Sequence, residues 1–143
     1  MSDADFFTLM LGKPYADRHC TYDAVDCWGL IALYYRDVHG VNIHHSDDYS
    51  KGSDFLTCFS DEVLFWEKHD QPVIGGIFVS YYGSFPRHVG IVVGRDKILH
   101  AREKTAVRFD RIETLKRVST KVEWLTYAGD SHTDNARTSP FYG

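Results

Sequence analysis

The fold of this chain is decided at residues 26–40, which read DCWGLIALYYRDVHG. Apolar side chains recur there at the i, i+3, i+4, i+7 and i+11 positions of a helix with one buried face, namely Cys27, Leu30, Ile31, Tyr34 and Val38. Asp26 precedes the run as a candidate N-cap, and Gly40 follows it as a candidate C-terminal stop. The pattern therefore predicts a helix that carries a cysteine in its first turn.

The segments around this helix are less regular. Residues 3–11 predict a short amphipathic helix capped by Ser2 or Asp3, and residues 15–25 predict a loop. A polar loop is expected at residues 42–52. Residues 55–69 are ambiguous, and we favour a helix capped by Ser60 for their second half.

From residue 74 onward the hydrophobic period changes to two, which indicates strands. We expect strands at residues 77–82, 88–93, 97–101, 106–109 and 121–127. Helices followed by antiparallel strands predict an α+β domain with the helices on one side of the sheet. This domain is expected to span residues 1–128, and the polar residues 129–143 are expected to form a loose tail.

Composition excludes several classes of function. The chain has 143 residues and a formal net charge of −4, without a basic block, so nucleic acid is not an expected partner. Its apolar runs are too short to insert in a membrane, and the acidic N-terminus lacks the apolar core of a signal peptide, so synthesis in the cytoplasm is expected.

Three cysteines, an odd number, argue against a disulfide framework. Cys20 and Cys58 are interpreted as structural thiols. A zinc site would have to use His19, Cys20, His44, His45 and Cys58, but these residues lack the spacing of known ligand pairs. We therefore expect no metal and no cofactor.

Cys27 has the setting of a nucleophile. A free thiol with its ordinary pKa of about 8.5 is mostly protonated at neutral pH, whereas the thiolate is the reactive form. The unpaired N–H groups and the dipole of a helix N-terminus stabilise negative charge, so we expect an activated thiolate at Cys27. The Cys27 N–H is a candidate oxyanion donor, and Gly29 is expected to leave room for a substrate backbone.

Two histidines lie on the arms of a predicted hairpin. His88 begins HVGIVVG at residues 88–94, and His100 lies in ILHA at residues 98–101. A three-residue loop at 94–96 would place His100 opposite Gly90, as the diagonal same-face neighbour of His88. A two-residue loop would place His100 on the other face unless a bulge intervened. In the first register, His88 is a base for Cys27, and His100 fixes the orientation and tautomer of its ring.

These motifs resemble those of the NlpC-type family of cell-wall cysteine peptidases. The resemblance rests on DCWGL at residues 26–30, on HVGI at residues 88–91 with Gly94, and on His100-Ala101, and it runs from about residue 5 to residue 127. It implies a papain-like fold, in which the Cys-bearing helix packs on a small antiparallel sheet.

The resemblance also implies roles for individual residues. Cys27 would be the nucleophile, His88 the base and His100 the orienting residue. Tyr15 is similar to the family's upstream tyrosine near the oxyanion site, and Trp28 and Gly90 are expected at the substrate site. The implied substrate is a peptidoglycan stem peptide, often cut at a γ-D-glutamyl amide.

The aromatic Trp28 and the stretch LYYRDVHG at residues 33–40 resemble tail-tip peptidases of long-tailed bacteriophages. We therefore expect a virion protein with other tail proteins as partners, acting at the bacterial cell wall. The alternative is a structural tail-tip component with a gated or vestigial triad, docking through the exposed aromatics Tyr81, Tyr82 and Phe85 and through the Phe141-Tyr142 end. Acyl transfer on the same triad is a third reading, because an amine can intercept the thioester.

Overall fold

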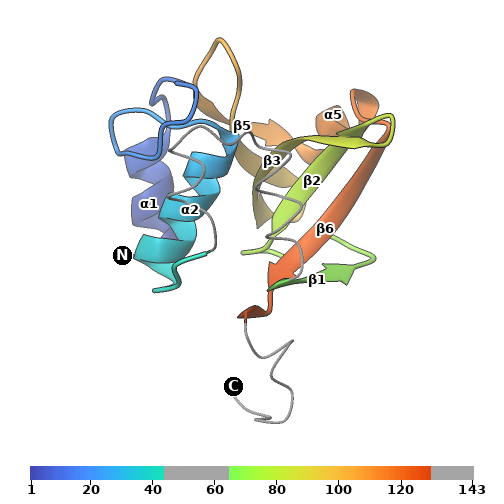
Figure 1. Cartoon of the computed structure of the whole chain (residues 1–143), viewed down its shortest axis with the longest axis horizontal. Helices are drawn as coiled ribbons and strands as arrows, with labels where there is room; N and C mark the ends of the chain where they lie inside the picture. Colours follow the sequence, from blue (N-terminus) through green and yellow to red (C-terminus); the bar gives the residue numbers. More distant parts are fainter. Residues whose placement is uncertain (44–64, 130–143) are drawn as a thin grey trace, which may run out of the picture.

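The computed structural model describes residues 1–43 and 65–129, and Figure 1 shows their arrangement. Its helices are α1 (Asp3–Met10), α2 (Cys27–Val38) and α5 (Ile112–Arg117), and its strands are β1 (Trp66–His69), β2 (Ile77–Tyr82), β3 (Phe85–Gly94), β4 (Lys97–Ala101), β5 (Val107–Arg111) and β6 (Lys121–Tyr127). None of the helices in these two ranges is long and apolar enough to cross a membrane.

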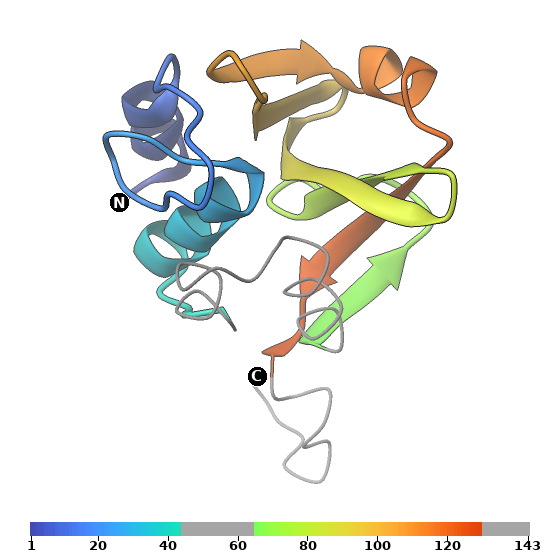
Figure 2. The ribbon, with the colours of Figure 1, turned by 45° about the horizontal axis from the view of Figure 1, so that its top comes forward.

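The six strands form one antiparallel sheet in the order β1-β6-β2-β3-β4-β5. Helices α1 and α2 lie on one side of this sheet and α5 lies on the other, as Figures 1 and 2 show. The predicted α+β fold, with the Cys-bearing helix on a small antiparallel sheet, is confirmed. The prediction that the helices share one side holds for α1 and α2 and is wrong for α5, which was not expected.

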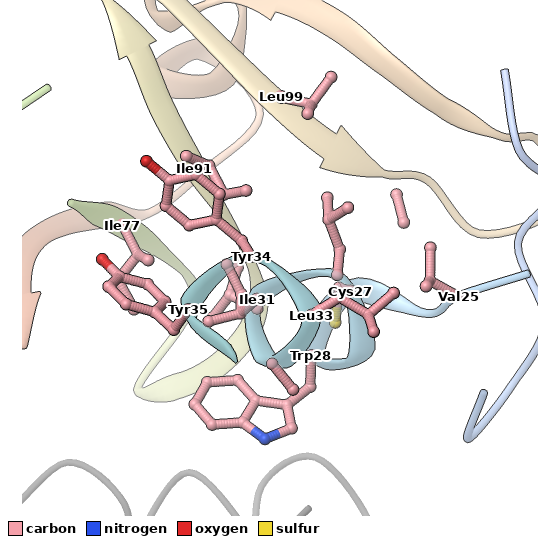
Figure 3. Packing of buried hydrophobic residues seen from close by; sticks show 14 of the residues in the cluster. Val25, Cys27, Trp28, Ile31, Leu33, Tyr34, Tyr35, Ile77, Ile91 and Leu99 are labelled. Carbon is pink, nitrogen blue, oxygen red and sulfur yellow. The ribbon is translucent and has the colours of Figure 1, made fainter. Parts of the chain in front are cut away.

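Alternation along the strands gives the sheet two apolar faces. On one face, Ile77, Ile91 and Leu99 join the buried residues of α2 in the main core, where Figure 3 shows Ile31, Tyr34 and Tyr35. On the other face, a smaller core contains Phe78, Val92, Ile98, Ile112, Leu115 and Trp124. Both faces of the central strands are therefore covered, which holds β3 and β4 in place.

Helix α2 begins at Cys27 because Asp26 caps it. The Asp26 carboxylate accepts hydrogen bonds of 2.7 Å from the main-chain N–H of Gly29 and 2.7 Å from that of Arg18. The side chain is fully buried, and a buried carboxylate persists only when donors satisfy it. The cap thus fixes the first turn of α2 and ties the preceding loop to it.

Some of the other local predictions are confirmed and one is wrong. Ser2 caps α1 by accepting a 3.1 Å hydrogen bond from the N–H of Asp5, and the strands at residues 77–82, 97–101 and 121–127 have the predicted bounds. The helix favoured up to residue 69 is wrong for residues 66–69, because β1 gains its main-chain hydrogen bonds from β6. Residues 44–52 of the expected loop, residues 55–64 of the ambiguous segment and residues 130–143 of the expected tail lie outside the described residues.

Candidate active site

The first residue of α2 carries the candidate nucleophile. Cys27 is 6 % exposed, and its sulfur is contacted by the main-chain N–H groups of Val89, Trp28 and Cys27 itself. Val89 directly follows His88 on β3, so the sulfur lies against the strand that carries the candidate base. Three N–H donors around one sulfur are the environment that stabilises a developing negative charge.

Burial nevertheless dominates the protonation of this thiol. It raises the pKa of Cys27 to about 12, the charge of Asp26 raises the pKa further, and the three N–H donors lower it only in part. The expected resting thiolate is therefore wrong for this structure, in which Cys27 is a neutral thiol. Sequence reasoning counted the helix N-terminus and omitted the desolvation of the sulfur and the charge of its own N-cap.

The β3–β4 hairpin settles the register of the histidines. Ile91 pairs with Leu99 and Gly94 with Lys97, and a bulge interrupts the ladder between Val92 and Gly94. The loop thus has two residues rather than the expected three. The bulge adds one unpaired residue to β3, which shifts the register by the same amount as a third loop residue would. Continued along the strands, the pairing of Ile91 with Leu99 places His100 opposite Gly90, as predicted.

The two histidine rings meet as this register requires. A hydrogen bond of 2.8 Å joins Nε2 of His88 to Nδ1 of His100, and the ring of Phe78 lies 5.7 Å and 6.0 Å from the two imidazoles, centroid to centroid. His100 is buried, whereas His88 is partly exposed. The bond engages Nε2 of His88, so Nδ1 remains as the nitrogen that can accept a proton from a thiol. The hydrogen bonds of the described residues include none between the Cys27 sulfur and His88, so proton transfer needs a rotation of one of these side chains.

Sequence reasoning missed one member of this cluster. Oδ2 of Asp110 lies 2.7 Å from Nε2 of His100, and Arg108 holds the same carboxylate at 3.0 Å through its Nε. Asp110 pairs with Ile98 across β4–β5, which makes it the diagonal same-face neighbour of His100. The register of this second hairpin, readable from the turn at residues 102–105, was the signal that could have found it.

The protonation states of the cluster follow from burial and charge. Burial lowers the pKa of His88, and His100 and Arg102 lower it further. The pKa of His100 is also lowered, mainly by burial, despite the hydrogen bond to Asp110. Burial alone would raise the pKa of Asp110, but the bond to His100 and the charges of Arg108 and Arg102 bring it below its ordinary value. At neutral pH both rings are therefore neutral and Asp110 is ionised.

Tyr15, the residue similar to the family's tyrosine, interacts electrostatically with the thiol of Cys27. It is half-buried, and a parallel bridge to Val25 and a 3.2 Å hydrogen bond from its N–H to the carbonyl of Thr105 position its backbone. Its pKa is raised mainly by burial, then by the negative charge that Cys27 carries when it is ionised and by the charge of Asp26. The phenol therefore keeps its proton at neutral pH and is available as a donor near Cys27.

The remaining candidates serve packing in this structure. The indole of Trp28 is 1 % exposed in the main core, so only its main-chain N–H faces the sulfur. A Cβ on Gly90 would lie 2.4 Å from the ring of Phe78 and 2.8 Å from Cβ of His100, so this glycine admits those two side chains. The expectation for Gly29 is wrong, because the space of its missing Cβ is filled by the carbonyl oxygen of His19, 2.1 Å away, and not left for substrate.

The structural thiol expected at Cys20 is confirmed. Its Sγ lies 3.4 Å from the carbonyl oxygen of Gly29, and the side chain packs against the main core. His44, His45 and Cys58 lie outside the described residues.

A cavity of about 620 Å³ opens on the α5 side of the histidines. Its lining includes Tyr82, Arg87, His88, His100, Arg102 and Asp110. The hydrogen-bonded chain from His88 to Asp110 is therefore reachable from this side, whereas Cys27 approaches β3 from the side of α2.

The paired histidines and the cysteine at a helix start agree with a comparison to known families, in which residues 12–124 match the model of the NlpC/P60 family. The chain belongs to the NlpC/P60 family. The enzyme class is accordingly that of a cysteine peptidase or amidase, and Cys27 at the start of α2 with the His88–His100 pair is consistent with its triad. No curated protein matches the sequence significantly.

Solved NlpC/P60 structures share the fold at low identity. The NlpC/p60 domain of the peptidoglycan hydrolase SagA is 16 % identical, with a TM-score of 0.58 over 85 % of this chain and 92 % of that one. NlpC2 from Trichomonas vaginalis is 18 % identical, with a TM-score of 0.61 over 88 % of this chain and 44 % of that one. An NlpC/P60 family protein from Bacillus cereus is 15 % identical, with a TM-score of 0.63 over 90 % of this chain and 40 % of that one. The chain thus spans less than half the length of the last two proteins.

Proposed function

We propose that this protein hydrolyses an amide bond in the stem peptide of peptidoglycan, at a γ-D-glutamyl linkage. The observation that carries the proposal is the sulfur of Cys27 at the N–H of Val89, the residue after His88, together with the 2.8 Å hydrogen bond through which His100 orients the His88 ring. Membership of the NlpC/P60 family and the fold shared with SagA, a peptidoglycan hydrolase, support the substrate class.

The chemistry follows from the resting protonation states. Once a side-chain rotation has brought the two groups together, the neutral thiol of Cys27 loses its proton to Nδ1 of His88 as the sulfur attacks the amide carbonyl. The N–H of Cys27 and the phenol of Tyr15 donate to the oxyanion. The C–N bond breaks as His88 returns the proton to the leaving amine. Water activated by His88 then cleaves the thioester, which frees the thiol and a γ-carboxylate.

The test is mass spectrometry of fragments released from purified cell walls. Cys27→Ala is expected to abolish release, and Cys20→Ala, which removes a thiol outside the cluster, is expected to leave it intact. Hydrolysis at a γ-D-glutamyl amide leaves a free γ-carboxylate on glutamate and a new amine on the next residue. Equal release by Cys27→Ala would refute the hydrolase, and fragments cut elsewhere would refute the bond.

We propose further that the protein acts at the cell wall as part of a bacteriophage tail tip. The support is the sequence likeness of Trp28 and of residues 33–40 to tail-tip peptidases. Virions assembled with Cys27→Ala are expected to retain the protein and to lose local wall degradation. Absence of the protein from purified virions would refute this location.

The second candidate is a structural tail-tip component with a gated or vestigial triad. Tyr82 and Phe85, at the β2–β3 turn, are 67 % and 60 % exposed and offer an apolar contact for a tail protein. The expectation of an exposed Tyr81 is wrong, because this side chain is half-buried and its hydroxyl donates a 2.7 Å hydrogen bond to Glu123, and Phe141 and Tyr142 lie outside the described residues. Under this candidate, replacing both Tyr82 and Phe85 with Ser removes the protein from the virion. Cell-wall zymography of the isolated wild type separates the two candidates, since the structural component leaves the wall intact.

A further inference from the structure

The His88–His100 pair is one part of a longer chain of hydrogen bonds. Nε2 of His88 meets Nδ1 of His100 at 2.8 Å, and Nε2 of His100 meets Oδ2 of Asp110 at 2.7 Å. The three groups come from three successive strands, β3, β4 and β5, and their side chains lie on the same face of the sheet. His100 has both ring nitrogens engaged, so its two partners determine where its one proton sits.

The carboxylate at one end of this series of hydrogen bonds determines which atom donates in each bond. An ionised carboxylate only accepts hydrogen bonds, so the neutral His100 ring must carry its proton on Nε2, facing Asp110. Nδ1 of His100 is then an acceptor, and it requires the proton of His88 on Nε2. Nδ1 of His88 is left unprotonated, which is the state a base for a thiol needs.

We propose that Asp110 is a positioning residue that acts through His100 to hold Nδ1 of His88 in its unprotonated, basic tautomer. The proposal rests on the role of His88 as base in the proposed function. Asp110 touches neither sulfur nor substrate in this role. When His88 takes the thiol proton, the carboxylate also stabilises the positive charge across two hydrogen bonds.

The surrounding charges allow a competing explanation. Arg108, opposite His100 on β5, binds both oxygens of Asp110, with Nε at 3.0 Å from Oδ2 and a terminal nitrogen at 3.1 Å from Oδ1. Arg102 and Glu103 face the same cavity from the turn after β4. Asp110 could therefore be only the partner of Arg108 in an ion pair that stabilises the sheet, and the experiment must separate this from positioning.

The variant that separates them is Asp110→Asn, which keeps the side-chain shape and can donate as well as accept. Its amide can turn an N–H toward Nε2 of His100, which moves the proton of His100 to Nδ1 and the proton of His88 to Nδ1. The matched control is Asp96→Asn, because Asp96 forms a comparable 3.0 Å ion pair with Arg111 and has no bond to a histidine in the structure of the described residues.

Two readouts need no cell-wall substrate, so they remain informative if the proposed substrate is wrong. The first is ¹⁵N NMR of the imidazoles at neutral pH, which reports which ring nitrogen carries the proton. The second is the rate of Cys27 alkylation by iodoacetamide across pH, followed by peptide mass spectrometry. Steady-state turnover of peptidoglycan fragments is a third readout, and it shows whether a variant changes kcat or KM.

Wild type is expected to show Nε2-protonated rings at both histidines, and Asp110→Asn a mixture of tautomers. Losing a carboxylate that touches the base directly costs about 10⁴-fold in kcat. Asp110 acts through one further ring, so we expect about 10- to 100-fold slower alkylation and lower kcat, with KM unchanged. Asp110→Glu is expected to restore part of the rate, and Asp96→Asn to retain the wild-type rate.

A double-variant cycle completes the test. In a His100→Asn background, adding Asp110→Asn is expected to slow alkylation no further, because the path from Asp110 to His88 is already cut. A further loss equal to that of Asp110→Asn alone would overturn the proposal. So would an Nδ1 proton on His100 in wild type, a measurement that stands even if Asp110→Asn fails to fold.

Discussion

Gly90→Ala tests whether the close packing of the histidine pair governs activity. Gly90 lies on the same face of β3 as His88 and Val92, two residues from each. A Cβ added to it would lie 2.4 Å from Cε2 of Phe78 and 2.8 Å from Cβ of His100. Ordinary contact begins at about 3.4 Å, so the Phe78 ring must withdraw by about 1 Å and His100 by about half as much. Phe78 is fully buried in the smaller core, which leaves it no free space.

The cost divides between stability and catalysis. Overpacking a buried site costs about 1–3 kcal/mol, so we expect the free energy of unfolding to fall by that amount. A shift of His100 by about 0.6 Å stretches its 2.8 Å bond to His88 to as much as about 3.4 Å, beyond the ordinary range of such bonds, and so weakens it. Misplacing a catalytic group by about 1 Å costs about 100-fold in rate, and the shift of His100 is about half as large, so we expect a loss of about 10-fold in Cys27 alkylation and in cell-wall hydrolysis.

The assay is urea unfolding together with alkylation kinetics, with Gly94→Ala as the matched control. Gly94 lies on the same strand, and a Cβ there would meet only Cβ of Lys97 at 3.5 Å. The control is expected to change the free energy of unfolding by less than about 0.5 kcal/mol and to leave the alkylation rate unchanged. If Gly90→Ala alkylates Cys27 at the wild-type rate, the packing around Gly90 does not position His100.

Three further outcomes follow from the site. Asp26→Ala, which removes both 2.7 Å hydrogen bonds of the α2 cap, is expected to cost about 2 kcal/mol in urea unfolding, and an unchanged midpoint would contradict the capping role. Because the pKa values of His88 and His100 are lowered in the folded state, the unfolded chain binds more protons below their ordinary pKa of about 6.5. Stability should therefore fall as pH drops below about 6.5, by at most about 1.4 kcal/mol per pH unit for each histidine, and a thermal-unfolding series on His100→Gln should show a shallower slope. Tyr15→Phe is expected to lower kcat by about 100-fold without changing stability, whereas Tyr82→Phe, at an exposed tyrosine, should keep wild-type kcat.

Several parts of the molecule were predictable because their determinants are local. The N-cap at Asp26 and the helical period after it depend on residues within four positions of each other. The strand at residues 77–82 follows from alternation alone. Even the pairing of His88 with His100 was within reach, because a short hairpin links the two residues and its length limits the possible registers.

The predictions that were wrong concern features whose determinants lie far apart along the chain. The strand at residues 66–69 depends on its pairing with β6, and each pair of residues in this ladder is separated by 55 or more positions along the chain. Helix α5 has only Ile112 and Leu115 as buried residues, too few for a periodic signal, and it forms against the smaller core. Gly29 was assigned to substrate access because nothing local reveals that the loop at His19 packs on its Cα.

The order of residues along the chain thus determined which groups could do chemistry, a cysteine at a capped helix start and two histidines one hairpin apart. Tertiary structure alone decided their electrostatic state. Packing of α2 on the sheet removes water from the Cys27 sulfur and raises its pKa, and the β4–β5 pairing brings Asp110 to His100. The physical reason is that period and capping act over a few residues, whereas desolvation and ion pairing depend on which distant segments the fold brings into contact.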